Sequence, residues 1–205
     1  MKITALEPQK HNRERLNLYI DGVFHSGIEI GTAAKLGFYE GKEVTETNLS
    51  QLDTEDDYQK CMNAALNLAS RRLQSEREYW QKLGKKYEKP IIGRCLDRLR
   101  QLGYANDQKF AEMWVRERSR TRGKRLLETE LKEKGIAKDI IQQVLEQTAP
   151  VINFEEIIQA ASKKFKSEDS YEKNYSRIAG FLGRKGYDYG IIKQVAAEIL
   201  KKTAE

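Results

Sequence analysis

The feature that most constrains the fold of this chain is a short residue pattern that occurs three times. A leucine is followed by a turn residue four positions later, and one or two isoleucines follow that turn. The copies are Leu83, Tyr87 and Ile92; Leu131, Gly135, Ile140 and Ile141; and Leu182, Gly186, Ile191 and Ile192. The leucines recur about every 50 residues, an interval typical of stacked arrays of small helical units, which usually serve as binding surfaces.

The composition narrows the class of protein. Charged residues make up 33% of the 205 residues and hydrophobic residues 39%, so the chain is able to build a core. The net charge of +6 favours an anionic partner, with nucleic acid ahead of a membrane. No apolar run is long enough to span a membrane, and the first ten residues lack the apolar core of a signal peptide. Cys61 and Cys95 are expected to be reduced core residues, so we predict a cytoplasmic protein.

The first 52 residues are predicted to form a small β-rich extension. Leu16, Leu18 and Ile20 alternate with polar or amphipathic neighbours, as in a half-buried strand. The dipeptide Asp21-Gly22 follows directly and predicts a tight hairpin turn, because both residues tolerate positive φ. Residues 3–6 are expected to add a strand, and residues 31–36 a short helix.

From Asp53 onward the pattern is helical. Thr54 with Asp57 is expected to cap the first helix, and a helix capped by Asn106 or Asp107 is expected to run to Gly123, with Trp114 in the core. The predicted domains are an extension at 1–52 and three-helix repeats at 53–103, 104–149 and 150–205. The fold class is therefore mostly α, with three tandem three-helix repeats forming a curved elongated array and a small N-terminal β-hairpin sheet.

Several segments carry a family resemblance. The segment Gly103–Ala111 and the stretch from Gly123 through Ile136 resemble the second repeat of the RecX family of regulatory proteins. The first repeat is similar through Arg71 or Arg72, Ser75, Glu78 and Leu83, and the hairpin Leu18–Gly22 is similar to the extension of longer members. The resemblance covers essentially the whole chain. Tyr79 and Tyr87 depart from it, standing where the family often has leucine and glycine.

The resemblance implies a non-enzymatic regulator. RecX proteins lodge in the groove of the RecA recombinase filament on DNA and adjust its assembly, strand exchange and co-protease activity, and most members inhibit. For this chain the resemblance therefore implies the RecA filament as partner. We also expect DNA phosphates as a secondary contact, no membrane partner, and a monomeric state.

The stretch Arg116–Arg125 is the best candidate for contacting that partner. It holds six basic residues and one acid, and the basic residues are Arg116, Arg118, Arg120, Arg122, Lys124 and Arg125. On a continuous helix Arg116 and Arg120 form one row and Arg118 and Arg122 another. Gly123 would place Lys124 and Arg125 at a helix start, where backbone amides favour anions. Contact with phosphates or acidic side chains is one interpretation; a solvated helix end with surface ion pairs is the other.

Two further basic groups complete the predicted binding surface. They comprise Arg71, Arg72, Lys85 and Lys86 in the first repeat, and Lys163, Lys164, Arg184 and Lys185 in the third. If the repeats stack, these groups would line one face together with Arg116–Arg125.

The sequence offers little for catalysis. His11 and His25 lie in the β-rich region without a nucleophile arranged around them, and no phosphate-binding glycine loop is present. We therefore predict no catalytic residue, metal or cofactor. Two alternatives to RecA regulation remain at this point: a helical DNA-binding protein that acts without RecA, and a neutral helical-repeat scaffold.

Overall fold

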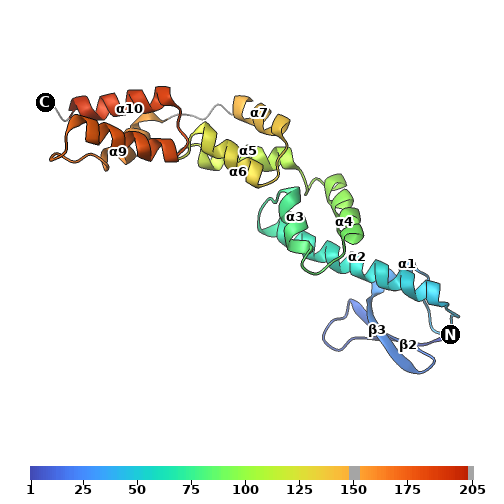
Figure 1. Cartoon of the computed structure of the whole chain (residues 1–205). Coiled ribbons are helices and arrows are strands. Elements are labelled where there is room, and N and C mark those ends of the chain that lie inside the picture. Colours follow the sequence, from blue (N-terminus) through green and yellow to red (C-terminus); the bar gives the residue numbers. More distant parts are fainter. Residues whose placement is uncertain (148–152, 203–205) are drawn as a thin grey trace. The chain divides into compact units, whose positions relative to one another are not determined.

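The computed structural model describes residues 1–147 and 153–202. This part of the chain forms a three-stranded sheet followed by helices (Figure 1). It divides into two compact units. The first comprises residues 1–74 and 78–105, and the second comprises residues 75–77 and the chain from Asn106 onward.

The predicted N-terminal sheet is confirmed. It contains β1 (Ile3–Pro8), β2 (Arg15–Ile20) and β3 (Val23–Glu29), antiparallel in the order β1-β2-β3. Asp21 and Gly22 form the turn with φ of 49° and 82°, because the two-residue connection requires left-handed backbone. Helix α1 (Ile30–Lys35) follows β3. The apolar face of the sheet packs around Leu18 and Ile28 against Leu52 of the next helix.

Helix α2 (Glu46–Arg71) begins earlier than predicted. The Thr45 hydroxyl accepts the Asn48 amide at 3.3 Å, and the Asn48 side chain accepts the Thr45 amide at 3.0 Å. Thr54, the predicted cap, lies inside the helix, where its hydroxyl donates to the Ser50 carbonyl. The prediction was wrong because asparagine replaces the glutamate or glutamine of the usual capping box. One continuous helix therefore carries the chain from the sheet into the first repeat.

The first three-helix repeat is completed by α3 (Glu76–Leu83) and α4 (Lys89–Gln101). Pro90 lies in the first turn of α4, where the missing amide proton is not needed. The core of this repeat includes Tyr79, Leu83 and both cysteines, which are fully buried free thiols. The prediction that Cys61 and Cys95 are reduced core residues is confirmed.

A buried carboxylate ties three helices of the first unit together. Glu55 on α2 accepts from Lys35 of α1 at 2.6 Å and from Arg94 of α4 at 2.8 Å. Arg94 in turn lies over the Tyr58 ring, 3.9 Å from its centroid. Burial opposes ionisation of Glu55, but the hydrogen bonds and charges of Lys35 and Arg94 outweigh it, so the pKa of Glu55 is lowered.

We expect Glu55→Gln to lower the free energy of unfolding by about 1–3 kcal/mol at neutral pH, because both cations lose a charged partner. A lowered folded-state pKa means that this stabilisation is present above the unfolded pKa and is lost as pH falls through the folded one. Urea unfolding measured against pH should therefore show the two proteins converging as the pH falls through the lowered pKa of Glu55, below the usual range of a glutamate. Glu40→Gln, in an exposed turn, is the control. A constant difference down to low pH would contradict the role of Glu55.

The second unit contains the other two repeats. Its helices are α5 (Asp107–Arg118), α6 (Lys124–Glu133), α7 (Lys138–Gln147), α8 (Phe154–Ser162), α9 (Tyr171–Arg184) and α10 (Tyr189–Lys202). Phe110, Leu127 and Leu131 are fully buried in the second repeat, and Ile178 and Leu182 are buried in the third. Asn106 caps α5 as predicted, its side chain accepting the Lys109 amide at 2.9 Å.

The sequence pattern predicts a helix from Phe154 to Lys166, but α8 ends at Ser162. The cause is Asn174, which is buried on α9. Its side chain accepts the Lys166 amide at 2.9 Å and donates to the Lys166 carbonyl at 2.8 Å. These bonds provide partners for the backbone amide and carbonyl of Lys166 without a helix, so the segment after Ser162 is stable in a non-helical conformation.

The glycines of the repeated pattern end their helices, as their place after a lysine-rich last turn predicts. Gly135 and Gly186 have φ of 83° and 81° and follow the C-caps Lys134 and Lys185. A left-handed residue at this position closes the last turn of the helix, which glycine does at least cost. The repeated pattern thus marks the corner between the second and third helices of a repeat.

Candidate partner-binding surface

The predicted basic stretch is not one helix. Helix α5 ends at Arg118, with the Ser119 amide bonded to the Val115 carbonyl at 2.8 Å. Arg120 and Arg122 therefore lie in the loop before α6, and the two expected rows of arginines do not form. The helix stops because the loop is fixed elsewhere: the Gly123 amide donates to the Lys185 carbonyl of the third repeat at 2.7 Å.

Glu130 of α6 forms ion pairs with two of the arginines. It accepts the indole N–H of Trp114 at 2.9 Å and forms ion pairs with Arg118 and Arg122. The Arg118 guanidinium also lies 3.6 Å from the centroid of the Trp114 ring. The predicted core position of Trp114 is confirmed only in part: its ring stacks on the buried Phe110 ring, with 5.5 Å between the centroids, but is itself half-buried and lies beneath the Arg118 cation. Arg118 and Arg122 are thus engaged within the second repeat.

Arg120 is engaged with the third repeat. Its guanidinium lies 2.7 Å from the Glu156 carboxylate of α8. The hydrogen bond from Arg120 lowers the pKa of Glu156. Both groups remain in contact with solvent, so this pair orients the loop more than it stabilises the fold.

The remaining cations of the stretch point to solvent. Arg116, Lys124 and Arg125 are exposed, and none has an acidic group within 4 Å in the part of the chain that the structure describes. Lys124 and Arg125 do occupy the first turn of α6, as predicted. The expected anion-binding amides are occupied, however: the Arg125 amide donates to Gly186 at 3.2 Å, and the Leu126 amide to Gly123 at 3.1 Å. Binding here depends on the side chains.

A backbone junction brings part of the third basic group beside this stretch. Gly123 contacts Gly186 and Tyr187 so closely that an added Cβ would lie 2.3 Å from the Gly186 carbonyl carbon and oxygen. A Cβ on Gly186 would lie 2.3 Å from the Leu126 amide nitrogen. Since Arg184 and Lys185 immediately precede Gly186, the junction places them beside the loop that holds Arg120.

The other predicted residues lie elsewhere. Arg71, Lys85 and Lys86 are exposed in the first unit, whereas Arg72 forms a two-pronged ion pair with Glu78 at 2.8 and 3.1 Å. In the second unit Lys163 and Lys164 follow α8, and the Lys164 ammonium lies 5.4 Å from the Phe181 ring centroid. A common binding face that joins these groups stays a prediction.

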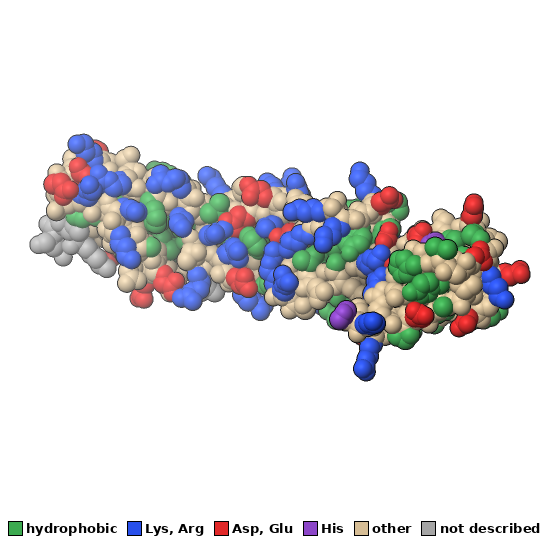
Figure 2. Space-filling model, turned by 90° about the horizontal axis from the view of Figure 1, so that it is seen from below, with side chains coloured by type: hydrophobic (Ala, Val, Ile, Leu, Met, Phe, Trp, Pro, Cys, Tyr) green, Lys and Arg blue, Asp and Glu red, His purple; other side chains and the backbone are tan. Residues whose placement is uncertain are grey.

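The surface is not uniformly basic. Figure 2 shows lysine and arginine side chains spread over the face that it presents, with acidic side chains between them. The exposed cations without acidic neighbours therefore define the candidate surface better than the density of basic residues in the sequence does.

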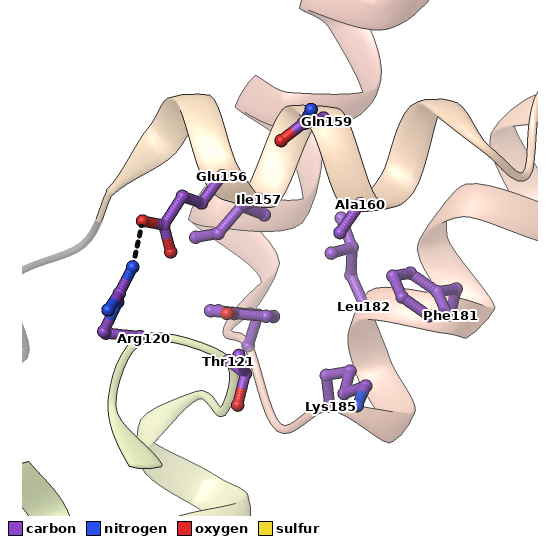
Figure 3. A pocket seen from close by; sticks show the side chains of 10 residues that line it. Arg120, Thr121, Glu156, Ile157, Gln159, Ala160, Phe181, Leu182 and Lys185 are labelled. Carbon is purple, nitrogen blue, oxygen red and sulfur yellow. Dashed lines mark hydrogen bonds and ion pairs between the residues drawn. The ribbon is translucent and has the colours of Figure 1, made fainter. Parts of the chain in front are cut away.

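A pocket lies against the loop of the second repeat. It measures about 420 Å³ and is lined by Arg120, Thr121, Glu156, Ile157, Gln159, Ala160, Phe181, Leu182, Lys185 and Tyr187. Figure 3 shows the Arg120–Glu156 ion pair at one side, with Ala160, Leu182 and Phe181 at the other. The sequence does not reveal this pocket, because its walls come from helices and loops far apart in the chain and no local pattern joins them.

The structure shows no sign of a metal centre or membrane span in the residues it describes. No cluster of three or more histidine, cysteine or acidic side chains is placed to hold a metal ion there. Within the same ranges, no helix combines the length and apolar character needed to cross a bilayer.

Comparisons with known proteins place the chain in a family. Models of the regulatory protein RecX N-terminal domain and of the first, second and third RecX three-helix domains match residues 1–45, 61–99, 106–145 and 152–196. The regulatory protein RecX of Listeria innocua is 32% identical over 97% of this chain and 76% of its own length. The chain belongs to the RecX family.

Further relatives agree with this assignment. The RecX of Clostridium tetani is 31% identical over 97% of this chain and 94% of its own length. A crystal structure of RecX from Lactobacillus salivarius is 30% identical, covering 71% of this chain and 97% of its own, with a TM-score of 0.62. Another crystal structure of regulatory protein RecX, 22% identical, supports the fold, with a TM-score of 0.78 over 95% of this chain. The RecX resemblance and the fold class of three three-helix repeats with an N-terminal sheet are confirmed.

Proposed function

We propose that this chain is a non-enzymatic regulator that binds the RecA filament on DNA and inhibits its assembly, strand exchange and co-protease activity. Membership of the RecX family, whose curated members carry the name regulatory protein, is the observation that supports this most. The proposal places the chain in the cytoplasm as a monomer, acting in recombination, repair and the SOS response.

The mechanism we propose is contact with adjacent filament subunits, assisted by phosphate contacts. Arg116, Lys124 and Arg125 are the side chains best suited to it, because they are exposed and have no acidic group within 4 Å in the described ranges. The glycine junction places Arg184 and Lys185 next to the start of α6, where Lys124 and Arg125 lie. Regulation further requires that the chain bind one filament state more tightly than another, since equal binding shifts no equilibrium.

The proposal predicts that stoichiometric protein lowers RecA ATPase activity on single-stranded DNA and shortens RecA filaments. A coupled ATPase assay and negative-stain electron microscopy measure the two effects. If neither changes when the protein equals RecA in concentration, the proposed function is wrong.

A parallel titration separates the DNA-binding alternative. The chain is titrated onto labelled single-stranded DNA without RecA, at low and at high salt. Tight binding that falls steeply with salt, together with an unchanged RecA ATPase once the DNA is in excess, favours a DNA-binding protein that acts alone. Weak binding without RecA, and inhibition that persists with excess DNA, favours the filament as the partner.

A further inference from the structure

We propose that the pocket lined by Ile157, Phe181 and Leu182 is a docking site for an acidic peptide segment that inserts one large aliphatic side chain. This inference rests on the proposed function, because it assigns the segment to the protein partner. The pocket would add an apolar contact with the partner, which the exposed basic side chains do not provide.

The floor of the pocket suits an aliphatic side chain. Ile157 and Leu182 are 4% and 1% exposed, and Tyr187 is buried beside them. The volume of about 420 Å³ exceeds what one side chain fills and falls in the range of pockets that hold ligands. Apolar pockets of this kind are where binding energy concentrates at protein interfaces, because an inserted side chain is fully removed from water.

The rim of the pocket is basic, which favours acidic residues next to the inserted aliphatic side chain of the peptide. The acid in the lining, Glu156, is already paired with Arg120 at 2.7 Å. Lys185 lines the pocket and Lys164 covers the Phe181 ring, and neither has an acidic group within 4 Å among residues 1–147 and 153–202. Carboxylates flanking the inserted side chain would therefore meet unpaired ammonium groups.

The pocket is formed before binding. Hydrogen bonds from Gly123 to Lys185 and from Arg125 to Gly186 hold the loop against the turn between α9 and α10. The Thr121 amide also bonds to the Arg118 carbonyl at 3.0 Å, which fixes the loop internally. A preformed site loses little conformational freedom when a peptide binds, so a short segment is enough.

A nucleotide base is a poorer fit than an aliphatic side chain. A base needs an aromatic face to stack on and hydrogen-bond partners for its edge. Here Lys164 lies over the Phe181 ring, and Arg120 and Glu156 already satisfy each other. Gln159 is the remaining neutral amide in the lining, and it is exposed.

The test uses the full chain without RecA and two labelled synthetic peptides built from glutamate and aspartate, one with a central leucine and one with a central alanine. Fluorescence anisotropy measures both affinities. The leucine peptide should bind about 10- to 50-fold more tightly, because the leucine side chain buries about three more carbons.

Ala160→Phe fills the pocket from the exposed face of α8 and should remove this difference. Lys185→Gln should weaken both peptides, whereas Lys193→Gln, an exposed lysine of α10, should weaken neither.

Three results would overturn the inference: equal affinity for the two peptides, a leucine preference that survives Ala160→Phe, or no binding by either peptide. The same holds if a labelled oligodeoxynucleotide competes with the leucine peptide and its own binding is lost in Ala160→Phe, which would assign the pocket to nucleic acid. Because RecA is absent from this assay, a negative peptide result does not bear on inhibition of the RecA ATPase. Conversely, a chain that binds the leucine peptide but does not affect RecA would contradict the proposed function and leave the docking site standing.

Discussion

Replacing Gly186 with alanine should destabilise the second unit by about 2–4 kcal/mol, more than the same change at Gly103 or Gly183. Two costs combine at this position. The new Cβ would lie 2.3 Å from the Leu126 amide nitrogen and 2.5 Å from the Leu126 Cβ, so helix α6 must move. The backbone also has φ of 81°, which alanine adopts only with strain.

Urea unfolding followed by tryptophan fluorescence measures this effect. A Trp80→Phe background leaves Trp114, which lies in the second unit, as the sole tryptophan reporter. Gly186→Ala should then shift the fluorescence transition to lower urea with little change in its slope. Because the two units need not unfold together, a reporter within the second unit is required.

Two other glycines separate the two costs. Gly103 has φ of 76° and open space around an added Cβ, so Gly103→Ala reports the backbone strain alone, about 1 kcal/mol in the first unit. It is followed through Trp80 of the same unit, in a Trp114→Phe background. Gly183 lies within helix α9 with open space and ordinary φ, so Gly183→Ala should stabilise by up to about 1 kcal/mol. Should Gly186→Ala cost no more than Gly103→Ala, close packing at the Gly123–Gly186 junction would not be what holds the two repeats together.

The repeated pattern predicted part of this from sequence. A glycine after a lysine-rich last turn indicates a left-handed helix end, and Gly135 and Gly186 both have that geometry. The pattern does not indicate the second role of these glycines. Gly135 lies against Arg77, with an added Cβ only 2.7 Å from its side-chain carbons, and Gly186 lies against Leu126. Close approach between segments far apart in the chain leaves no local pattern, because it depends on tertiary packing.

The wrong helix boundaries at α2 and α5 have different causes. Helix α2 begins at Glu46 through a Thr45–Asn48 pair that the usual capping pattern does not include. Helix α5 ends at Arg118 although no helix-breaking residue occurs before Gly123, because the loop that follows is bonded to the third repeat. Local patterns predict where a helix is able to form, but an unusual side-chain cap moved the start of α2 and a distant hydrogen bond accompanies the early end of α5.

The candidate surface was predicted as a segment but not as individual residues. Six basic residues between Arg116 and Arg125 are evident in the sequence. Which of them are engaged depends on Glu130 and Glu156, whose positions relative to the arginines follow only from the fold. Arg118, Arg120 and Arg122 form ion pairs within the fold, so the partner-binding hypothesis, which stays a prediction, is best supported for the other three.

Reversing the charge of those three residues should abolish most of the regulatory activity. In the variant Arg116→Glu/Lys124→Glu/Arg125→Glu we expect the concentration that half-inhibits RecA ATPase to rise about 100-fold at low salt, and less at high salt. The loss would not reflect unfolding. Lys124→Glu and Arg125→Glu favour the helix dipole at the start of α6, whereas Arg116→Glu opposes it at the end of α5 and Lys124→Glu places a like charge one turn from Glu128. These effects oppose one another, so the free energy of unfolding should change by less than about 1 kcal/mol.

The matched variant is Arg118→Gln/Arg122→Gln. It removes two cations from the same stretch, but these two form ion pairs with Glu130. It should lower the free energy of unfolding by about 1–3 kcal/mol, since Glu130 loses both ion pairs, while half-inhibition stays close to that of the unaltered chain when the protein is folded. The two variants therefore separate binding from stability within a single short stretch. If the charge-reversed variant and the unaltered chain inhibit equally at both salt concentrations, these three cations do not contact RecA. That result would favour a neutral scaffold, whose binding does not depend on surface charge.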